Sequence, residues 1–207
     1  MQVLTPSRSD NPISTTSPQA YPETQSPHDD ARRILSGASD LLAQADALLG
    51  SLDPSDYTTP VAAAFNATIG GHLRHCLDHF LSLLNGFDSG FIDYDRRDRD
   101  PRIERDLDYA RSLVRTLRSD LNQLDVELLD APIQTRCEVS YRQGNSPISQ
   151  SSLGRELVYA IAHGIHHFAL IAIMARLQGI RIAEGFGMAP STLAHLRTQA
   201  STGEGSR

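Results

Sequence analysis

Cysteine is scarce in this sequence. Its 207 residues include only Cys76 and Cys137, which are too few for the disulfide framework of a small secreted protein. A single bridge between these two residues stays compatible with the sequence. No N-terminal segment resembles a signal peptide, and no apolar run reaches the length that spans a membrane. These absences predict a cytoplasmic protein with reduced thiols and without a membrane partner.

Positive charge is not concentrated in any part of the chain. The net charge is -6, and acidic and basic residues are mixed throughout. Binding to a phosphate backbone requires a sustained positive field, so nucleic acid is not an expected partner. The length and the apolar fraction of 40% suit one domain with a single core.

The first 28 residues contain few large apolar side chains and many Ser, Thr and Pro residues. Such a segment buries too little apolar surface to offset the entropy lost on ordering. With one arginine and two acidic residues, it also lacks the basic character of a transit peptide. We therefore predict a disordered arm over residues 1–28, one domain over residues 29–199 and a flexible tail over residues 200–207.

Four segments show the apolar spacing of amphipathic helices, with repeats at three and four positions. The predicted helices run from Asp29 to Leu49, from about Ala64 to Leu84, from Pro101 to Leu124, and from Ser151 or Ser152 to about Gln178. Asp29 or Asp30 is expected to cap the first helix and Asp100 the third. The fourth helix is apolar nearly all round, which predicts that it is buried.

A short segment before the fourth helix has the pattern of a strand instead. Residues 133–141 alternate between apolar and polar side chains, and the turn residues "RQGNSP" that follow allow a hairpin with residues near Ile148. No other strand pattern is convincing. We predict an all-α fold, a four-helix bundle with a small β-strand or hairpin insertion before the last long helix. A short helix from Ser191 is expected to pack beside the bundle.

Residues 93–106, "DYDRRDRDPRIERD", alternate in charge and include five arginines. A solvated loop that leads into a helix is the commoner interpretation of such a pattern. In the alternative interpretation, one or two of the arginines bind an anionic substrate, because guanidinium pairs with carboxylate or phosphate through two parallel hydrogen bonds. The sequence leaves both interpretations open.

Six of the eight histidines lie in two short segments, "GHLRHCLDHF" and "AHGIHHF". The first segment places His72, His75 and His79 on one face of a helix. In the second, His163 and His167 are one turn apart on a stripe that elsewhere is core. A buried imidazole needs a partner, because an unsatisfied polar group costs roughly 1–3 kcal/mol. A shared metal ion is one such partner, and carbonyl groups or buried water are others.

Two histidines one helical turn apart can bind one ion, and a third ligand from another helix completes a site. Three neutral imidazoles leave a coordination position for water or substrate, as catalytic sites do. Zinc, nickel and iron all accept this ligand set, so the expected cofactor is a divalent metal of unspecified identity.

The segments "TIGGHLRHCLDHF" and "HGIHH" resemble the DinB-like family of metalloenzymes, over about residues 29–199. The resemblance implies an up-down-down-up four-helix bundle, with the metal ligands at His75, His163 and His167. The alternative ligands are His72, His79 and His166. Characterised relatives include thiol-dependent transferases and isomerases, which implies S-transfer from a low-molecular-weight thiol.

Beside these histidines, Glu156 is our candidate for proton transfer or for a hydrogen bond to a ligand, because it lies two turns before His163 on the same face. Tyr159 and Cys76 are also close in the sequence, and core packing is the simpler interpretation of both. The competing hypothesis is a non-catalytic helical bundle that works by forming a homodimer or by binding another protein.

Overall fold

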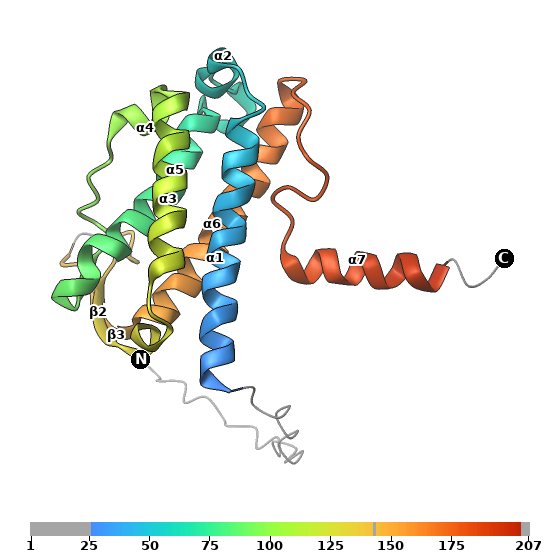
Figure 1. Cartoon of the computed structure of the whole chain (residues 1–207). Coiled ribbons are helices and arrows are strands. Elements are labelled where there is room, and N and C mark those ends of the chain that lie inside the picture. Colours follow the sequence, from blue (N-terminus) through green and yellow to red (C-terminus); the bar gives the residue numbers. More distant parts are fainter. Residues whose placement is uncertain (1–25, 143, 204–207) are drawn as a thin grey trace, which may run out of the picture.

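Four long helices form the body of the protein (Figure 1). In the computed structural model, residues 26–142 and 144–203 are described, so the predicted arm as far as residue 25 and the predicted tail from residue 204 lie outside them. The long helices are α1 (Pro27–Leu49), α3 (Ile69–Gly86), α5 (Leu107–Gln123) and α6 (Leu153–Leu177). Helix α1 lies against α5 and α6, and α3 lies against α6. The four long helices that were predicted are present, and the fold is mostly helical.

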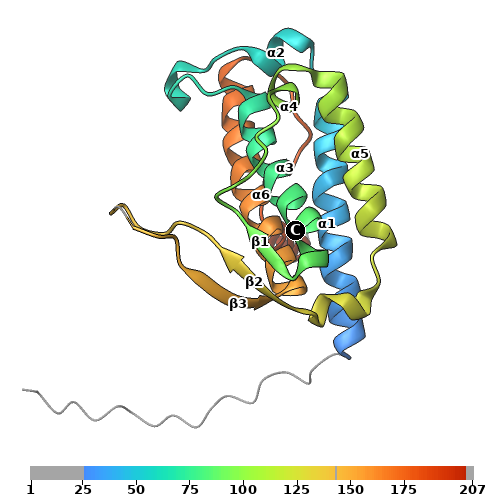
Figure 2. The same ribbon diagram turned by 90° about the vertical axis from the view of Figure 1, so that its left-hand side faces the viewer.

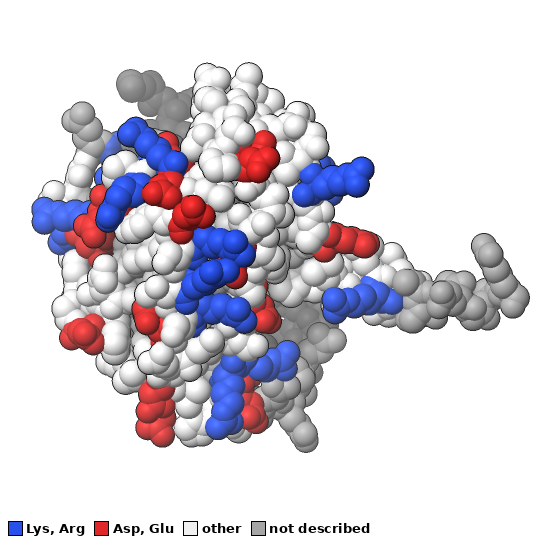
Figure 3. Space-filling view, turned by 45° about the horizontal axis from the view of Figure 1, so that its top comes forward, with Lys and Arg blue, Asp and Glu red and all other residues white. Residues whose placement is uncertain are grey.

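Shorter elements connect these helices. The helical ones are α2 (Pro54–Thr58), α4 (Pro101–Arg105), α7 (Pro190–Gly203) and the 3-10 turns η1 (Ala62–Ala64), η2 (Phe87–Ser89) and η3 (Val126–Asp130). The strands are β1 (Phe91–Asp93), β2 (Pro132–Arg136) and β3 (Ile148–Ser152). On the face shown in Figure 3, acidic and basic side chains are interspersed.

Helix α1 begins two residues earlier than predicted. Ser26 is the N-cap, and its hydroxyl accepts a hydrogen bond from the backbone N–H of Asp29 at 3.3 Å. Pro27 occupies the first helical position, where its missing N–H costs nothing. The prediction that Asp29 or Asp30 caps the helix is therefore wrong. Both lie in the first turn, where their negative charge favours the helix dipole.

Helix α3 begins later than predicted, at Ile69 instead of Ala64. Thr68 caps it by accepting a hydrogen bond from the N–H of Gly71 at 2.8 Å. Directly upstream, Phe65 and Asn66 have left-handed backbones with φ of 54° and 61°. A right-handed helix cannot pass through two such residues, so the apolar run before them forms a turn.

The third predicted helix is divided into α4 and α5. Asp100 caps α4 through the N–H of Arg102 at 2.9 Å, and Pro101 is its first residue, both as predicted. Asp106 then adopts an extended backbone and caps α5 through the N–H of Tyr109, also at 2.9 Å. The helical spacing continues across this break, which is why the sequence predicts one helix.

A small mixed sheet lies at one end of the bundle (Figure 2). Strands β2 and β3 pair antiparallel, which confirms the hairpin, and β1 pairs parallel with β2. The sequence analysis missed β1, because three residues are too few for an alternating pattern. The predicted strand also ends at Arg136 instead of residue 141. The all-α prediction is thus corrected to a mostly helical fold with a three-stranded sheet.

Helix α6 begins after its N-cap Ser152 and ends at Leu177, close to the predicted bounds. With 25 residues and a window of mean hydropathy 1.7, it is long and apolar enough to cross a membrane, which corrects the expectation that no such run exists. Core helices of soluble proteins have the same properties, and 44% of this window is buried inside the bundle. The helix is not buried all round, since Val158, Ile173 and Leu177 are exposed.

Helix α7 projects away from the bundle, so the prediction that the terminal helix packs beside the bundle is wrong (Figure 1). The segment before α7 is nevertheless attached to α6. The ring of Phe186 stacks on that of Phe168, with centroids 5.0 Å apart. Gly187 has a φ of 72° and lies against the carbonyl group of Phe168, where a Cβ atom would come within 2.6 Å of the oxygen.

Candidate metal centre

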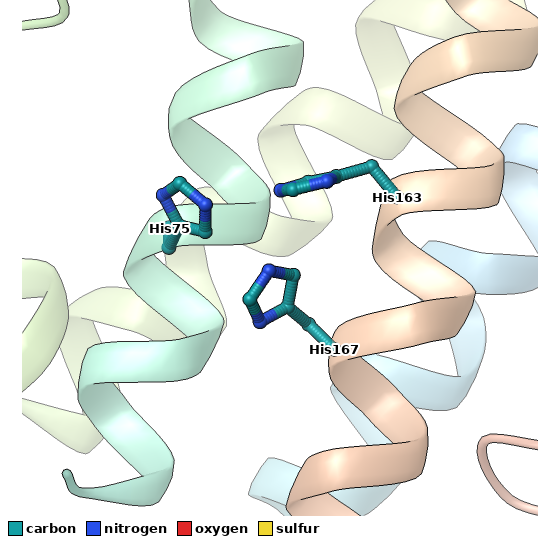
Figure 4. A group of neighbouring side chains, drawn as sticks. All are labelled: His75, His163 and His167. Carbon is teal, nitrogen blue, oxygen red and sulfur yellow. The ribbon is translucent and has the colours of Figure 1, made fainter. Parts of the chain in front are cut away.

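Helices α3 and α6 bring three of the predicted ligands together. His75 on α3 faces His163 and His167 on α6 (Figure 4). One ligand atom from each residue lies within 4.8 Å of the other two. The ring centroid of His75 is 4.9 Å from that of His163 and 4.7 Å from that of His167. The imidazole rings from the two helices therefore converge as expected, and metal binding itself stays a prediction.

The surroundings of these rings fit a cation. The Nε2 atom of His163 is buried and has no hydrogen-bond partner among the residues described. Burial lowers the pKa of all three imidazoles, and neighbouring histidines lower it further. Arg97 lowers the pKa of His75 and His163 as well. The pKa falls to about 3 for His75 and for His167. The rings are therefore neutral at physiological pH, which is the form that binds a metal.

His72 lies beside the three rings and contacts one of them. Its Nδ1 atom is 2.9 Å from the Nδ1 atom of His167, so one of the two nitrogens donates a hydrogen bond to the other. This contact occupies Nδ1 of His167 and leaves its Nε2 atom for a ligand role. Partners of this kind orient a metal-binding histidine and fix its tautomer.

The other two alternative ligands are less suited to the role. His79 is 3% exposed, and both of its nitrogens are engaged: Nδ1 donates to the carbonyl oxygen of His75 at 2.9 Å, and Nε2 accepts from Nη1 of Arg97 at 3.3 Å. His166 is exposed on the outer side of α6. The two residues thus differ from His163, whose Nε2 has no partner within the described structure.

Arg97 is the arginine of the charged segment, residues 93–106, that faces the histidine cluster. Its side chain is half-buried against His79, and its Nε atom is buried without a hydrogen-bond partner in the described part of the chain. Arg102, by contrast, is exposed and paired with Asp100 at 2.7 Å. The segment therefore contains both a solvated ion pair and an arginine directed at the histidine cluster.

Glu156 is buried, but its carboxylate binds hydroxyl groups. It accepts hydrogen bonds from Tyr94 at 2.8 Å and from Ser151 at 2.6 Å. Tyr94 in turn stacks on His79, with ring centroids 5.5 Å apart. Glu156 thus reaches the cluster through Tyr94, and its proposed part in proton transfer stays a prediction. Tyr94 was missed because it follows the short strand β1.

Tyr159 and Cys76, which were interpreted as packing residues, do pack against other side chains. Tyr159 stacks beside His163 at 5.8 Å, and Cys76 is 2% exposed in the core. Burial raises the pKa of the Cys76 thiol. A protonated, enclosed thiol is a poor metal ligand and a poor nucleophile.

Replacing Glu156 by alanine is expected to destabilise the fold by about 2–3 kcal/mol, because the buried hydroxyl of Tyr94 and the half-buried hydroxyl of Ser151 lose their acceptor. Urea unfolding followed by circular dichroism would measure the change. Glu127 is exposed, and its replacement by alanine serves as the control, with a change of at most about 0.5 kcal/mol. Equal stabilities of the two variants would contradict a structural role for Glu156.

Comparison with known proteins adds a family to this geometry. The family profile described as the DinB superfamily matches residues 38–171. FK506-binding protein 5 of Rhizopus delemar is 32% identical over 108 residues, which are 52% of this chain and 28% of that protein. The chain thus spans under a third of that relative. No solved structure matches the chain.

Proposed function

Because the chain belongs to the DinB superfamily, we propose that it is a metal-dependent enzyme in which His75, His163 and His167 hold a divalent cation. The observation that carries the proposal is the buried Nε2 atom of His163, which has no hydrogen-bond partner among the described residues. Leaving such an atom unsatisfied costs about 1–3 kcal/mol, and binding a cation removes that cost. Zinc, nickel and iron suit three imidazoles.

We propose a small thiol as the substrate and S-transfer as the reaction. A divalent cation lowers the pKa of a bound thiol or water, so that a nucleophile is present at neutral pH. The thiol proton passes to solvent, and the sulfur then bonds to an electrophilic carbon whose leaving group departs with its electron pair. The residues around the site orient and enclose it: His72 holds His167, and Tyr159 stacks against His163.

The test begins with the metal content of the purified protein. Dialysis against Zn²⁺, Ni²⁺ or Fe²⁺ followed by elemental analysis is expected to give one cation per chain. Low-molecular-weight thiols are then combined with electrophilic acceptors, and loss of free thiol is followed. The proposal fails if no cation binds at this ratio, or if the loaded protein consumes no thiol beyond the rate of a metal-free sample.

A chain without a metal would favour the second candidate, a non-catalytic bundle that binds a partner or a second copy. The specific observation behind it is the exposed apolar side chains of α6, namely Val158, Ile173 and Leu177. Exposed apolar patches are common at sites of protein association. Absence of metal therefore leaves only the second candidate, and a metal-loaded protein that consumes no thiol favours it as well.

A further inference from the structure

A cavity of about 390 Å³ opens beside the histidine cluster, next to the first turns of α3. Its lining includes His75 and His167 and also a pair of opposite charges, Arg74 on α3 and Glu104 on α4. Sites for small molecules have volumes of about 300–1,000 Å³. A small ligand in this cavity can therefore touch the charged pair and the proposed metal ligands at the same time.

The charged pair has unused hydrogen-bonding capacity. Nη1 of Arg74 donates to Oε2 of Glu104, and the side chains are 27% and 29% exposed. A guanidinium group carries five N–H donors, and a carboxylate accepts up to four hydrogen bonds. The Nε–H of Arg74 is buried and has no partner in the part of the chain that the structure describes. Both groups can bind a ligand without giving up their contact with each other.

The two charges are also held in place. Gly70 packs directly against the backbone carbonyl of Glu104, and the hydroxyl of Tyr57 donates to the carbonyl oxygen of Ile103. The first contact joins α4 to the start of α3, and the second joins α4 to α2. A ligand that binds the pair therefore meets groups that are already ordered, which lowers the entropy cost of binding.

We propose that this cavity binds the head group of an α-amino acid, either free or at the end of a small thiol. Arg74 pairs with the carboxylate, Glu104 accepts hydrogen bonds from the ammonium group, and the remainder of the ligand extends toward His75 and His167. A guanidinium group matches a carboxylate through two parallel hydrogen bonds. This inference rests on the metal site proposed above and names the substrate class for it.

The opposite charges select a ligand that also carries both. A simple carboxylate or a phosphate bound to Arg74 lies beside the negative charge of Glu104 and is repelled by it. In the same way, a simple amine bound to Glu104 is repelled by the positive charge of Arg74. A zwitterion satisfies both residues. The charged pair thus favours an amino acid over a dianion of similar size.

Three thiols that differ only in their charged groups provide the test: L-cysteine, 3-mercaptopropionate, which lacks the ammonium group, and cysteamine, which lacks the carboxylate. Each is titrated into protein loaded with Co²⁺, and cobalt–thiolate absorption reports binding. L-cysteine is expected to bind about tenfold tighter than either analogue, since one charged hydrogen bond contributes about 1.4 kcal/mol or more. Equal affinities for the three thiols would overturn the proposal.

Two variants assign the charges. Arg74→Gln is expected to weaken the binding of L-cysteine and 3-mercaptopropionate about tenfold. It should not weaken the binding of cysteamine, whose ammonium group is repelled by Arg74 in the unchanged protein. Glu104→Gln is expected to weaken the binding of L-cysteine and cysteamine, and not the binding of 3-mercaptopropionate. The control is Arg102→Gln, which removes an exposed arginine of α4 outside the cavity. If a pocket variant weakens all three thiols equally, it acts on the fold and the proposal is wrong.

Failure of the metal site is recognised separately. The cobalt spectrum before any thiol is added reports whether histidines bind the ion, so its absence contradicts the proposed function. In that case, calorimetry of L-serine with the metal-free protein decides the inference by itself. Heat of binding that Arg74→Gln abolishes supports a head-group site, and no heat with the unchanged protein refutes it.

Discussion

Replacing His163 by alanine is expected to lower the affinity of the protein for Zn²⁺ by about a hundredfold or more. The variant removes one of the three imidazoles that are proposed to hold the ion. The ring of His163 is also the one whose Nε2 atom is buried without a partner in the described residues. His166→Ala is the matched control, because His166 belongs to the same helix and is exposed. Its affinity should stay within about twofold of the original. Competition with a coloured chelator measures both.

The same experiment ranks the remaining histidines. His75→Ala and His167→Ala should lose as much affinity as His163→Ala, because each removes a ligand. His72→Ala should lose only about tenfold, since this residue holds His167 by a hydrogen bond. An unchanged affinity in His163→Ala, or a loss in His166→Ala as large as in the three ligand variants, would rule out the site.

Replacing Gly70 by alanine is expected to destabilise the fold by about 3 kcal/mol, because the new methyl group enters a space that is already filled. Its Cβ atom would overlap the carbonyl oxygen of Glu104 and would lie 2.9 Å from the ring of Tyr57. Backbone atoms cannot rotate aside as the end of a side chain can. Urea unfolding of the metal-free protein, followed by circular dichroism, measures the loss.

Gly37→Ala is the control for this prediction. Gly37 also lies inside a long helix, and a Cβ atom there would meet only the side chain of Ile161, at 3.7 Å. Because alanine favours a helix over glycine, this variant should be stabilised by up to about 1 kcal/mol. If Gly70→Ala is as stable as Gly37→Ala, the close approach of α3 and α4 is not present in solution.

The histidine cluster could be predicted from the sequence because helical periodicity is a local property. A spacing of four residues places His163 and His167 on one side of α6, and the apolar stripe around them identifies the side that faces the core. The same regularity gave the bounds of α6 closely. The location of His75 opposite them needed the resemblance to a family as well.

Features that depend on contacts between distant segments could not be predicted. Arg74 and Glu104 belong to different helices, and nothing in the local sequence pairs them. Tyr94 follows a strand of three residues that exists only because β2 lies beside it. The left-handed residues Phe65 and Asn66 ended the apolar run before α3, although neither is a glycine. The thiol substrate, the cytoplasmic location and the homodimer stay predictions.

The origin of the three imidazoles on two different helices has a consequence for folding. A cation bound to all of them would fasten α3 to α6 and close a long loop of chain between them, and the unfolded chain offers no comparable site. The ion would then act as a reversible cross-link between the two helices. Chelation should loosen the α3–α6 half of the bundle first, while α1 and α5 keep their mutual contacts.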